Sequence, residues 1–318
     1  MHGPASPPSV HEIAHLTASD RTGALVFAST ASATALGLWL SAQPGWLLWS
    51  MGQLLLGAAL VQWFIVLHEC GHRTLFRRRR PNIWAGRVAG FFSIIPYHVW
   101  ARVHGRHHKW TGWQDVDPTT ATLVPRPLAR WERIVVNVCW RGWVPIFSVL
   151  YRLNNFWNLL RLRMLFPEDE RRAISWSALS LAGAYVAMAI VIGPALLVRL
   201  FGVANVLAFI VEDVLLISQH THIPMTRSGG QPVPPYPPLD QERFTRSMRL
   251  PRVLSRLALH FDAHELHHMF PAVPGYRLEE IGYVAAHEVP VGTWVPAARA
   301  VPGAVLLFQS RNESGFDL

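Results

Sequence analysis

Four long stretches of this chain carry almost no charge, and they constrain its fold more than any other feature. Gly23–Ala42 contains no charged residue, Trp46–Leu67 contains none over 22 residues, and Ile174–Val198 contains none over 25. A fourth apolar run begins at Phe201 and continues to Glu212. About 20 apolar residues are enough to span a bilayer as a helix. The sequence therefore predicts transmembrane helices near residues 23–42, 46–67, 174–198 and 201–219.

The basic residues predict how these helices are oriented. The chain has 29 lysines and arginines against 20 aspartates and glutamates, but the predicted linkers 41–45 and 199–202 hold only Arg199. Cytoplasmic loops carry the excess of lysine and arginine, so we expect the two linkers outside and the rest of the hydrophilic chain in the cytoplasm. The basic surface then faces anionic lipid headgroups. No nucleic-acid-binding motif is visible, and nucleic acid is not an expected partner.

The segment 128–166 alternates apolar stretches with arginines and predicts amphipathic helices that lie in the membrane interface. Six arginines carry this pattern: Arg130, Arg133, Arg141, Arg152, Arg161 and Arg163. A third spanning hairpin is the alternative, but it would have to bury arginines.

The expected fold class is an all-α membrane protein with four transmembrane helices in two hairpins and a cytoplasmic helical cap. The expected organisation is a cytoplasmic N-terminal arm (1–22), a membrane domain (23–280) and a cytoplasmic C-terminal tail (281–318).

Ten of the 16 histidines fall into four tight groups. These are His68 and His72; His104, His107 and His108; His220 and His222; His264, His267 and His268. Residues three and four apart share one face of a helix, so each triplet directs three imidazoles to one point. Neutral imidazole is the commonest metal ligand in proteins. The spacing therefore predicts metal binding.

The number of histidines predicts more than one metal ion. A tetrahedral zinc ion takes about four ligands, whereas three of the groups alone supply eight histidines. The only cysteines are Cys70 and Cys139, which excludes a thiolate cluster and leaves iron, zinc or copper. The predicted topology returns the chain to the cytoplasm before each group, so all four are expected on one face of the membrane.

The four histidine motifs resemble those of the integral-membrane fatty acid desaturase and hydroxylase family. They read His68-Glu-Cys-Gly-His72, His104-Gly-Arg-His-His108, Gln219-His-Thr-His222 and His264-Glu-Leu-His-His268. The first and third are similar to those of the acyl-lipid delta-12 type. The run that follows the last motif, from His267 to Leu278, resembles bacterial fatty acid desaturases and carotenoid-modifying relatives. The resemblance covers roughly residues 46–280.

The resemblance implies a non-haem centre of two iron ions that uses O₂ as co-substrate. The ligands it implies are His68, His72, His104, His107, His108, His264, His267 and His268. The third motif supplies one more, for which we favour His222 by spacing, while His220 is expected to donate a supporting hydrogen bond or to bind the metal itself.

Several carboxylates could support the metal ligands, because ligating histidines donate their other N–H to a carboxylate or a carbonyl. Those close to a motif in sequence are Glu69, Asp115, Asp117, Asp262 and Glu265. Glu212 and Asp213 are less expected, because they lie within the fourth apolar run, where a charge costs about 2.5 kcal/mol or more at the helix centre. One of them is expected to support the metal site or to line the substrate path.

The expected function is an O₂-dependent desaturase that acts on acyl-lipids or other long-chain hydrophobic substrates in a membrane. A membrane di-iron hydroxylase and a carotenoid ketolase or hydroxylase remain open, because the same metal chemistry serves them. An intramembrane zinc metalloprotease is a distant alternative, because His68–His72 and His264–His268 both match HExxH. A histidine-rich metal carrier is a further one.

Partners and compartment follow from what the chain contains. No haem, iron–sulfur or dinucleotide motif is present, so we expect a separate electron donor of the ferredoxin or cytochrome type. The N-terminus does not resemble a signal or transit peptide, and Lys109 is the only lysine. We expect a bacterial inner membrane, with the active site on the cytoplasmic side.

Overall fold

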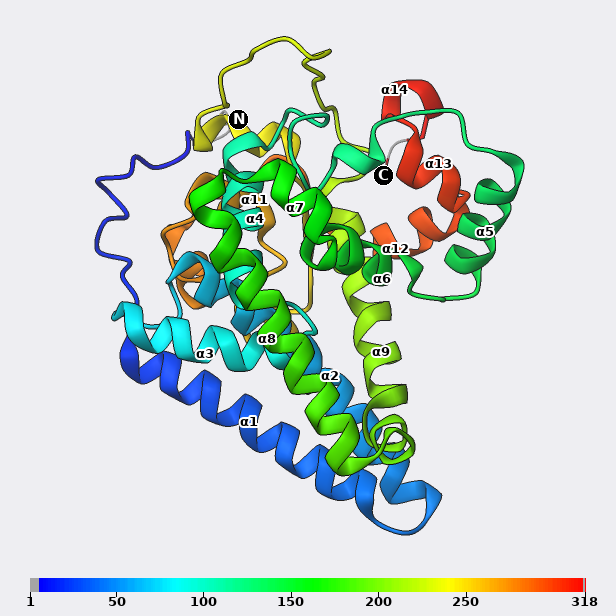
Figure 1. Cartoon of the computed structure of the whole chain (residues 1–318). Coiled ribbons are helices and arrows are strands. Elements are labelled where there is room, and N and C mark those ends of the chain that lie inside the picture. Colours follow the sequence, from blue (N-terminus) through cyan, green and yellow to red (C-terminus); the bar gives the residue numbers. More distant parts are fainter. Residues whose placement is uncertain (1–5, 317) are drawn as a thin grey trace. The chain divides into compact units, whose positions relative to one another are not determined.

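The computed structural model describes residues 6–316 and 318 and is built almost entirely from helices (Figure 1). Two compact units can be separated: unit 1 comprises residues 1–18, 104–146 and 214–318, and unit 2 comprises residues 19–103 and 147–213. Residues 1–5 of the expected N-terminal arm and residue 317 of the expected tail lie outside the described residues.

Four helices are long and apolar enough to cross a membrane: α1 (Asp20–Ala42), α2 (Trp46–His72), α8 (Glu168–Ile192) and α9 (Pro194–His220). The predicted all-α fold with four candidate spans is therefore confirmed. Their surfaces fit a lipid environment, because Ile190 and Val191 on α8 are 78% and 83% exposed. In water such a row of apolar side chains would be unfavourable.

The expected break between the last two spans, at residues 199–202, is wrong. The helix breaks at Gly193, whose φ of 87° few other residues adopt, and Pro194 begins α9 because proline suits a first helical turn. The third span is accordingly Glu168–Ile192 rather than 174–198. Arg199 was predicted to lie in a linker because it interrupts the apolar run with a charge, although it lies within α9.

Helices α1 and α2 form a packed hairpin within unit 2 (Figure 1). The Trp63 indole N–H donates to the hydroxyl of Thr34 at 2.8 Å. The Gln53 amide donates to Ser41 Oγ at 2.8 Å and to the Leu200 carbonyl at 2.7 Å, and so ties α9 to this hairpin. Inside a membrane these hydrogen bonds satisfy groups that lipid cannot.

Gly52 lets α1 and α2 approach closely. A Cβ at this position would lie 2.5 Å from the backbone nitrogen of Ser41 and 2.8 Å from the carbonyl oxygen of Gly37. Because backbone cannot give way as a side chain does, we expect Gly52→Ala to lower the free energy of unfolding by about 1–3 kcal/mol. Thermal unfolding in detergent would measure this. Gly183→Ala is the matched control, because no atom lies within 4 Å of its Cβ; equal stability of the two variants would contradict the prediction.

The segment 128–166 is helical as expected, with α5 (Arg130–Arg141), α6 (Ile146–Arg152), a π-helical turn η2 (Leu153–Trp157) and α7 (Leu159–Leu165). Its position in the membrane interface stays a prediction. Arg152 departs from the expected pattern, because it is buried at 3% exposure instead of reaching towards water.

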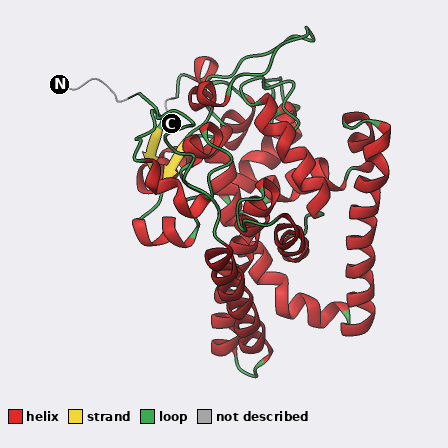
Figure 2. Cartoon of the chain, turned by 90° about the vertical axis from the view of Figure 1, so that its left-hand side faces the viewer, coloured by secondary structure: helices red, strands yellow, loops and turns green. Residues whose placement is uncertain are grey.

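Shorter elements complete the two units. They are α3 (Arg79–Phe92), α4 (Tyr97–Trp110), η1 (Ala121–Leu123), η3 (Pro238–Phe244), β1 (Ser247–Arg249), α10 (Arg252–Leu257), α11 (His264–Met269), η4 (Gly275–Ile281), β2 (Glu288–Pro290), α12 (Val291–Ala300), α13 (Gly303–Phe308) and α14 (Arg311–Ser314). Strands β1 and β2 pair in parallel, as the short yellow arrows of Figure 2 show.

The C-terminal segment 281–318 is part of the fold of unit 1 rather than a separate tail. Its β2 strand pairs with β1, and Trp294 is only 1% exposed. The Trp140 indole donates to the Ala298 carbonyl at 3.2 Å, and the Ala304 amide donates to Asn137 Oδ1 at 2.9 Å. The apolar runs here are short and broken by prolines, so the sequence pattern did not predict that they would pack.

Candidate metal centre

Three histidine motifs lie together in unit 1, at the ends of α4 and α9 and on α11. In α4 the spacing of His104, His107 and His108 places all three imidazoles on one side of the helix. The six residues of α11, which include the last histidine triplet, are all buried. Packing against the N-terminal segment fixes α11, because Leu266 and Met269 share a hydrophobic cluster with Ile13 and Leu16.

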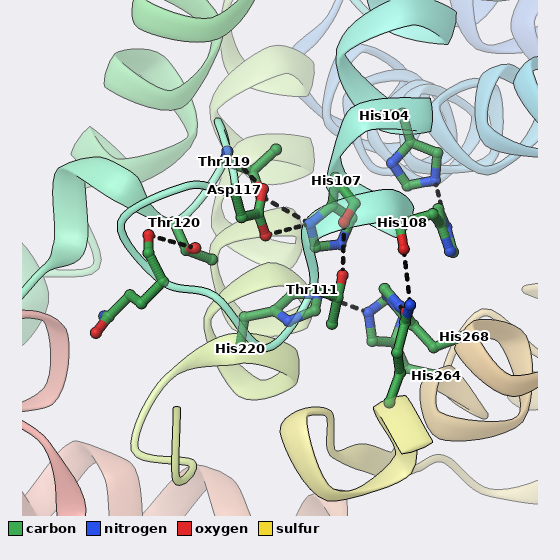
Figure 3. A network of polar contacts seen from close by, with 12 residues as sticks. His104, His107, His108, Thr111, Asp117, Thr119, Thr120, His220, His264 and His268 are labelled. Carbon is green, nitrogen blue, oxygen red and sulfur yellow. Dashed lines mark hydrogen bonds and ion pairs between the residues drawn. The ribbon is translucent and has the colours of Figure 1, made fainter. Parts of the chain in front are cut away.

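Four of these histidines form one group: His107, His220, His264 and His268. One ring nitrogen from each lies within 4.8 Å of the corresponding nitrogens of the others. The Nε2 atoms of His220 and His264 are 2.8 Å apart. Figure 3 shows His107, His220, His264 and His268 gathered around one volume.

The other three histidines of unit 1 converge beside them. Nε2 of His108 lies 3.2 Å from Nε2 of His104 and 3.0 Å from Nε2 of His267. Two nitrogens held about 2.1 Å from one metal ion at a right angle would be separated by about 3.0 Å. The spacing of these Nε2 atoms is therefore that of ligands sharing an ion.

His68 and His72 lie at the C-terminal end of α2, in unit 2. Their ring centroids are 4.9 Å apart, as expected for residues four apart on a helix. His68 is buried, and its Nδ1 lies 3.3 Å from the Glu69 carboxylate. The two imidazoles therefore point the same way and offer a pair of ligands.

Asp117 holds the imidazole of His107. Its Oδ2 accepts from His107 Nδ1 at 2.6 Å, and its Oδ1 accepts from the hydroxyl of Thr119 at 2.9 Å (Figure 3). Asp117 is completely buried. A carboxylate on Nδ1 fixes the tautomer and leaves the lone pair of Nε2 for a metal ion. Of the two aspartates suggested after the second motif, Asp117 contacts a histidine, whereas Asp115 binds the Ser228 hydroxyl at 2.9 Å.

Gln241 supports His268 in the same way, and sequence reasoning missed it. Its Oε1 accepts from His268 Nδ1 at 2.9 Å, while its amide donates to the His108 carbonyl at 2.8 Å. One side chain thus joins the ends of α4 and α11. Gln241 precedes the last histidine motif by more than twenty residues, in a 3₁₀ turn without any motif, so no sequence signal marked it.

The donor set fits a metal ion. Nε2 of His268 and Nδ1 of His220 are buried and lack a hydrogen-bond partner among residues 6–316 and 318. A buried polar atom without a partner costs about 1–3 kcal/mol, and coordination would remove this cost. Burial, and then the neighbouring imidazoles, lower the pKa of His268 well below its usual value. The ring is therefore neutral, which is the form that binds metals.

His220, rather than the favoured His222, lies with the other histidines. His220 ends α9 and joins the group of four, whereas the backbone of His222 turns to a φ of 55° beyond the helix. His222 instead contacts the Leu306 carbonyl through Nδ1 at 3.3 Å and the Ser314 hydroxyl through Nε2 at 2.6 Å. A change of backbone direction within two residues separates their side chains.

Arg246 stabilises this turn. Its buried guanidinium donates to the carbonyls of Ser218, Thr221 and His222 at 2.8, 3.0 and 3.1 Å. Ser218 lies in the last turn of α9, where carbonyls lack partners within the helix, and Thr221 and His222 follow directly after it. Arg246 therefore fixes the end of α9 on which His220 is carried.

Asp262 and Glu265, which were also suggested, have partners in the backbone around α11. Asp262 accepts from the Leu250 amide at 2.9 Å, and Glu265 accepts from the Ser247 and His287 amides at 3.1 and 2.7 Å. These two residues hold the backbone around α11. Burial is the main cause that raises the pKa of Glu265, to about 7.

Glu212 and Asp213 are engaged within unit 2 and belong to neither histidine group. Glu212 forms an ion pair with the buried guanidinium of Arg152. Asp213 accepts from the backbone amide of Ser148 at 2.6 Å. Each carboxylate is held by α6, and a role of either in supporting the metal site or lining the substrate path stays a prediction.

Asp117→Asn is expected to weaken metal binding by about 10- to 100-fold, because an amide no longer fixes the His107 tautomer as a carboxylate does. Competition with a chelator would measure the affinity. Asp115→Asn is the matched control, because Asp115 accepts from the Ser228 amide at 2.9 Å and contacts no histidine. Equal affinities of the two variants would show that Asp117 has no role in holding the metal.

Several desaturases are similar in sequence to parts of this chain. An sn-1 oleoyl-lipid 12-desaturase of Anabaena variabilis is 34% identical over 98 residues, which is 31% of this chain and 28% of the relative. A second, of Picosynechococcus, is 34% identical over 119 residues, 37% of this chain and 33% of its own. This chain thus matches about a third of the length of these two relatives.

A longer match extends across most of the chain. A probable fatty acid desaturase of Sorghum bicolor is 25% identical over 276 residues, covering 80% of this chain and 68% of the relative. The model of the family described as fatty acid desaturase matches residues 44–295, which include all four histidine motifs. The chain therefore belongs to the fatty acid desaturase family.

Proposed function

We propose that this protein is an O₂-dependent acyl-lipid desaturase that uses a histidine-bound pair of iron ions. The observation that carries the proposal is the division of seven histidines of unit 1 into two neighbouring groups, one of four and one of three. One zinc ion would need only about four ligands. The relatives from Anabaena variabilis and Picosynechococcus are both named as oleoyl-lipid 12-desaturases, which supports an acyl-lipid substrate.

The ligands are assigned to two ions on this basis. His107, His220, His264 and His268 would hold the first. His104, His108 and His267 would hold the second. We further propose His68 and His72 of α2 as metal ligands. This assigns nine histidines in all and replaces His222 by His220 as the ligand from the third motif.

The iron pair supplies the oxidising chemistry that acid–base side chains lack. Removal of two hydrogens from an acyl methylene pair provides two electrons, and a separate donor provides two more, so that O₂ is reduced to two molecules of water. The donor is proposed to be a ferredoxin or a cytochrome; the name of one relative, an omega-3 desaturase of Arabidopsis thaliana that is 23% identical, includes cytochrome b5.

The protein's own contribution is to hold and shield the imidazoles. Asp117 and Gln241 fix the tautomers of His107 and His268 through their Nδ1 atoms. Burial of His107, His264 and His268 to 4% exposure or less keeps bulk water away from the reacting centre. We further propose that this centre faces the cytoplasm from a bacterial inner membrane.

A zinc protease is disfavoured by the glutamates of the two HExxH motifs, because its general base must reach a metal-bound water. Both glutamates are buried and engaged by neighbouring groups. Glu69 accepts from the hydroxyl of Thr74 at 2.8 Å, and Glu265 accepts from backbone amides. Neither is free to act as a base.

The test is expression in a host with a simple lipid profile, followed by mass spectrometry of its fatty acids and pigments. We expect acyl chains that have lost two hydrogens, in amounts that depend on O₂ and on a supplied electron donor. Hydroxylated acyl chains or oxygenated carotenoids in their place would contradict a desaturase. Turnover with NAD(P)H alone would contradict the need for a separate donor.

A further inference from the structure

A large pocket of about 1030 Å³ lies within unit 2. Its walls come from the end of α2, from α3, from the start of α4 and from the first half of α8. His72 lies at its edge, but the proposed function leaves the rest of the pocket without a role.

One side of the pocket is strongly basic. Arg73, Arg79, Arg87 and Arg102 line it, and no aspartate or glutamate is among the described lining residues. Arg102 pairs with Glu170 at 2.9 Å. The other three form no ion pair with any carboxylate in the described part of the chain.

Arg73, Arg79 and Arg87 line this one pocket together with Tyr97, whose hydroxyl donates to the Cys70 carbonyl at 3.0 Å. Arginine binds phosphate through two parallel N–H groups. Several guanidinium groups that line one pocket, without carboxylates to balance them, favour a phosphate ligand.

Apolar side chains also line the pocket, and part of its lining follows a candidate membrane span. Ile83, Phe91 and Leu181 contribute to it, and the α8 residues that line the pocket run from Ala173 to Ala184. Eleven helical steps of about 1.5 Å correspond to about 16 Å along the axis of α8. Trp176, which is 63% exposed, lies near the start of this track, where aromatic residues mark the membrane interface.

A second, apolar hollow of about 280 Å³ continues this track. It shares Phe91 with the basic pocket, and its α8 residues are Tyr185 and Met188, which lie one and four residues after Ala184. An apolar path thus leads from the arginines along α8, as an acyl chain attached to a phosphate would require.

We propose that this pocket binds an anionic phosphoglyceride, with its phosphate at Arg73, Arg79 and Arg87 and an acyl chain along α3 and α8. The proposal goes beyond the desaturase reaction, because it concerns a lipid site that is measurable without metal or turnover. Each arginine close to anionic lipid headgroups strengthens the binding of the protein to these lipids. Inorganic phosphate carries the same kind of charged group as the lipid headgroup, so the experiment must distinguish binding of the lipid from binding of free phosphate.

The experiment is a binding titration of the purified full-length protein in detergent, with native mass spectrometry as the readout. The probes are phosphatidylglycerol, a neutral diacylglycerol and inorganic phosphate. The test variant is Arg79→Gln with Arg87→Gln; Arg73 is left unchanged because it adjoins His72. The matched control is Arg77→Gln with Arg80→Gln, which removes the same charge from exposed arginines outside the pocket.

We expect phosphatidylglycerol to bind wild type and control alike, and the test variant about 10- to 30-fold more weakly. Equal weakening in both double variants would overturn the proposal. So would equal binding of the neutral lipid, or displacement of phosphatidylglycerol by inorganic phosphate at the same concentration. If the double variant does not fold, as judged by thermal unfolding, Arg87→Gln alone against Arg80→Gln gives the same comparison.

Discussion

Replacing His220 by alanine is expected to abolish turnover and to remove one of the two proposed metal ions, whereas the same change at His222 should leave both. His220 is the only residue of α9 in the group of four. Without it, three imidazoles remain to hold an ion in a buried site. His222 contacts Leu306 and Ser314 instead.

Lipid mass spectrometry of expressing cells and metal analysis of the purified variants would test this pair. The two positions are a close match, since they lie two residues apart in one motif and carry the same side chain. If His222→Ala lost metal and His220→Ala retained it, His222 would be the ligand, as the sequence spacing suggested. That result would contradict the assignment of His220 from the geometry.

Arg152→Ala is expected to lower the free energy of unfolding by about 3–5 kcal/mol, because it leaves the buried carboxylate of Glu212 without its counter-charge. Arg152 also donates to the Ser93 carbonyl at 3.0 Å, and its guanidinium lies 4.2 Å from the centre of the Phe209 ring. Its loss therefore removes contacts to α3 and α9 together.

Thermal unfolding in detergent would measure this loss. The control is Arg163→Ala, an exposed arginine of the same segment, which should change stability by less than about 0.5 kcal/mol. Arg152→Met with Glu212→Leu should recover much of the stability, since a buried ion pair can be replaced by apolar residues with little loss. If Arg152→Ala were as stable as the control, the ion pair would have no part in holding α6 to α9.

The sequence predicted the long helices and the histidine motifs well, because both depend on local patterns. Apolar runs of about 20 residues identify a span, and a helical spacing of three or four identifies a shared face. The boundary at Gly193 was missed, since charge at Arg199 was given more weight than the glycine and proline that end one helix and begin the next.

The contacts that depend on distant residues could not be predicted. Arg152 and Glu212 lie 60 residues apart, and nothing in either segment indicates the other. The choice between His220 and His222 depended on where α9 ends and on Arg246, which holds that end. Gln241 had no motif to mark it, whereas Asp117 was suggested because it lies close to the second histidine motif in sequence.

The central claim is that these histidines hold two iron ions, and the metal content of the purified full-length protein tests it most directly. Elemental mass spectrometry of wild-type protein, expressed with sufficient iron and never exposed to a chelator, should give about two irons per chain. A single zinc per chain, or no bound metal at all, would contradict it.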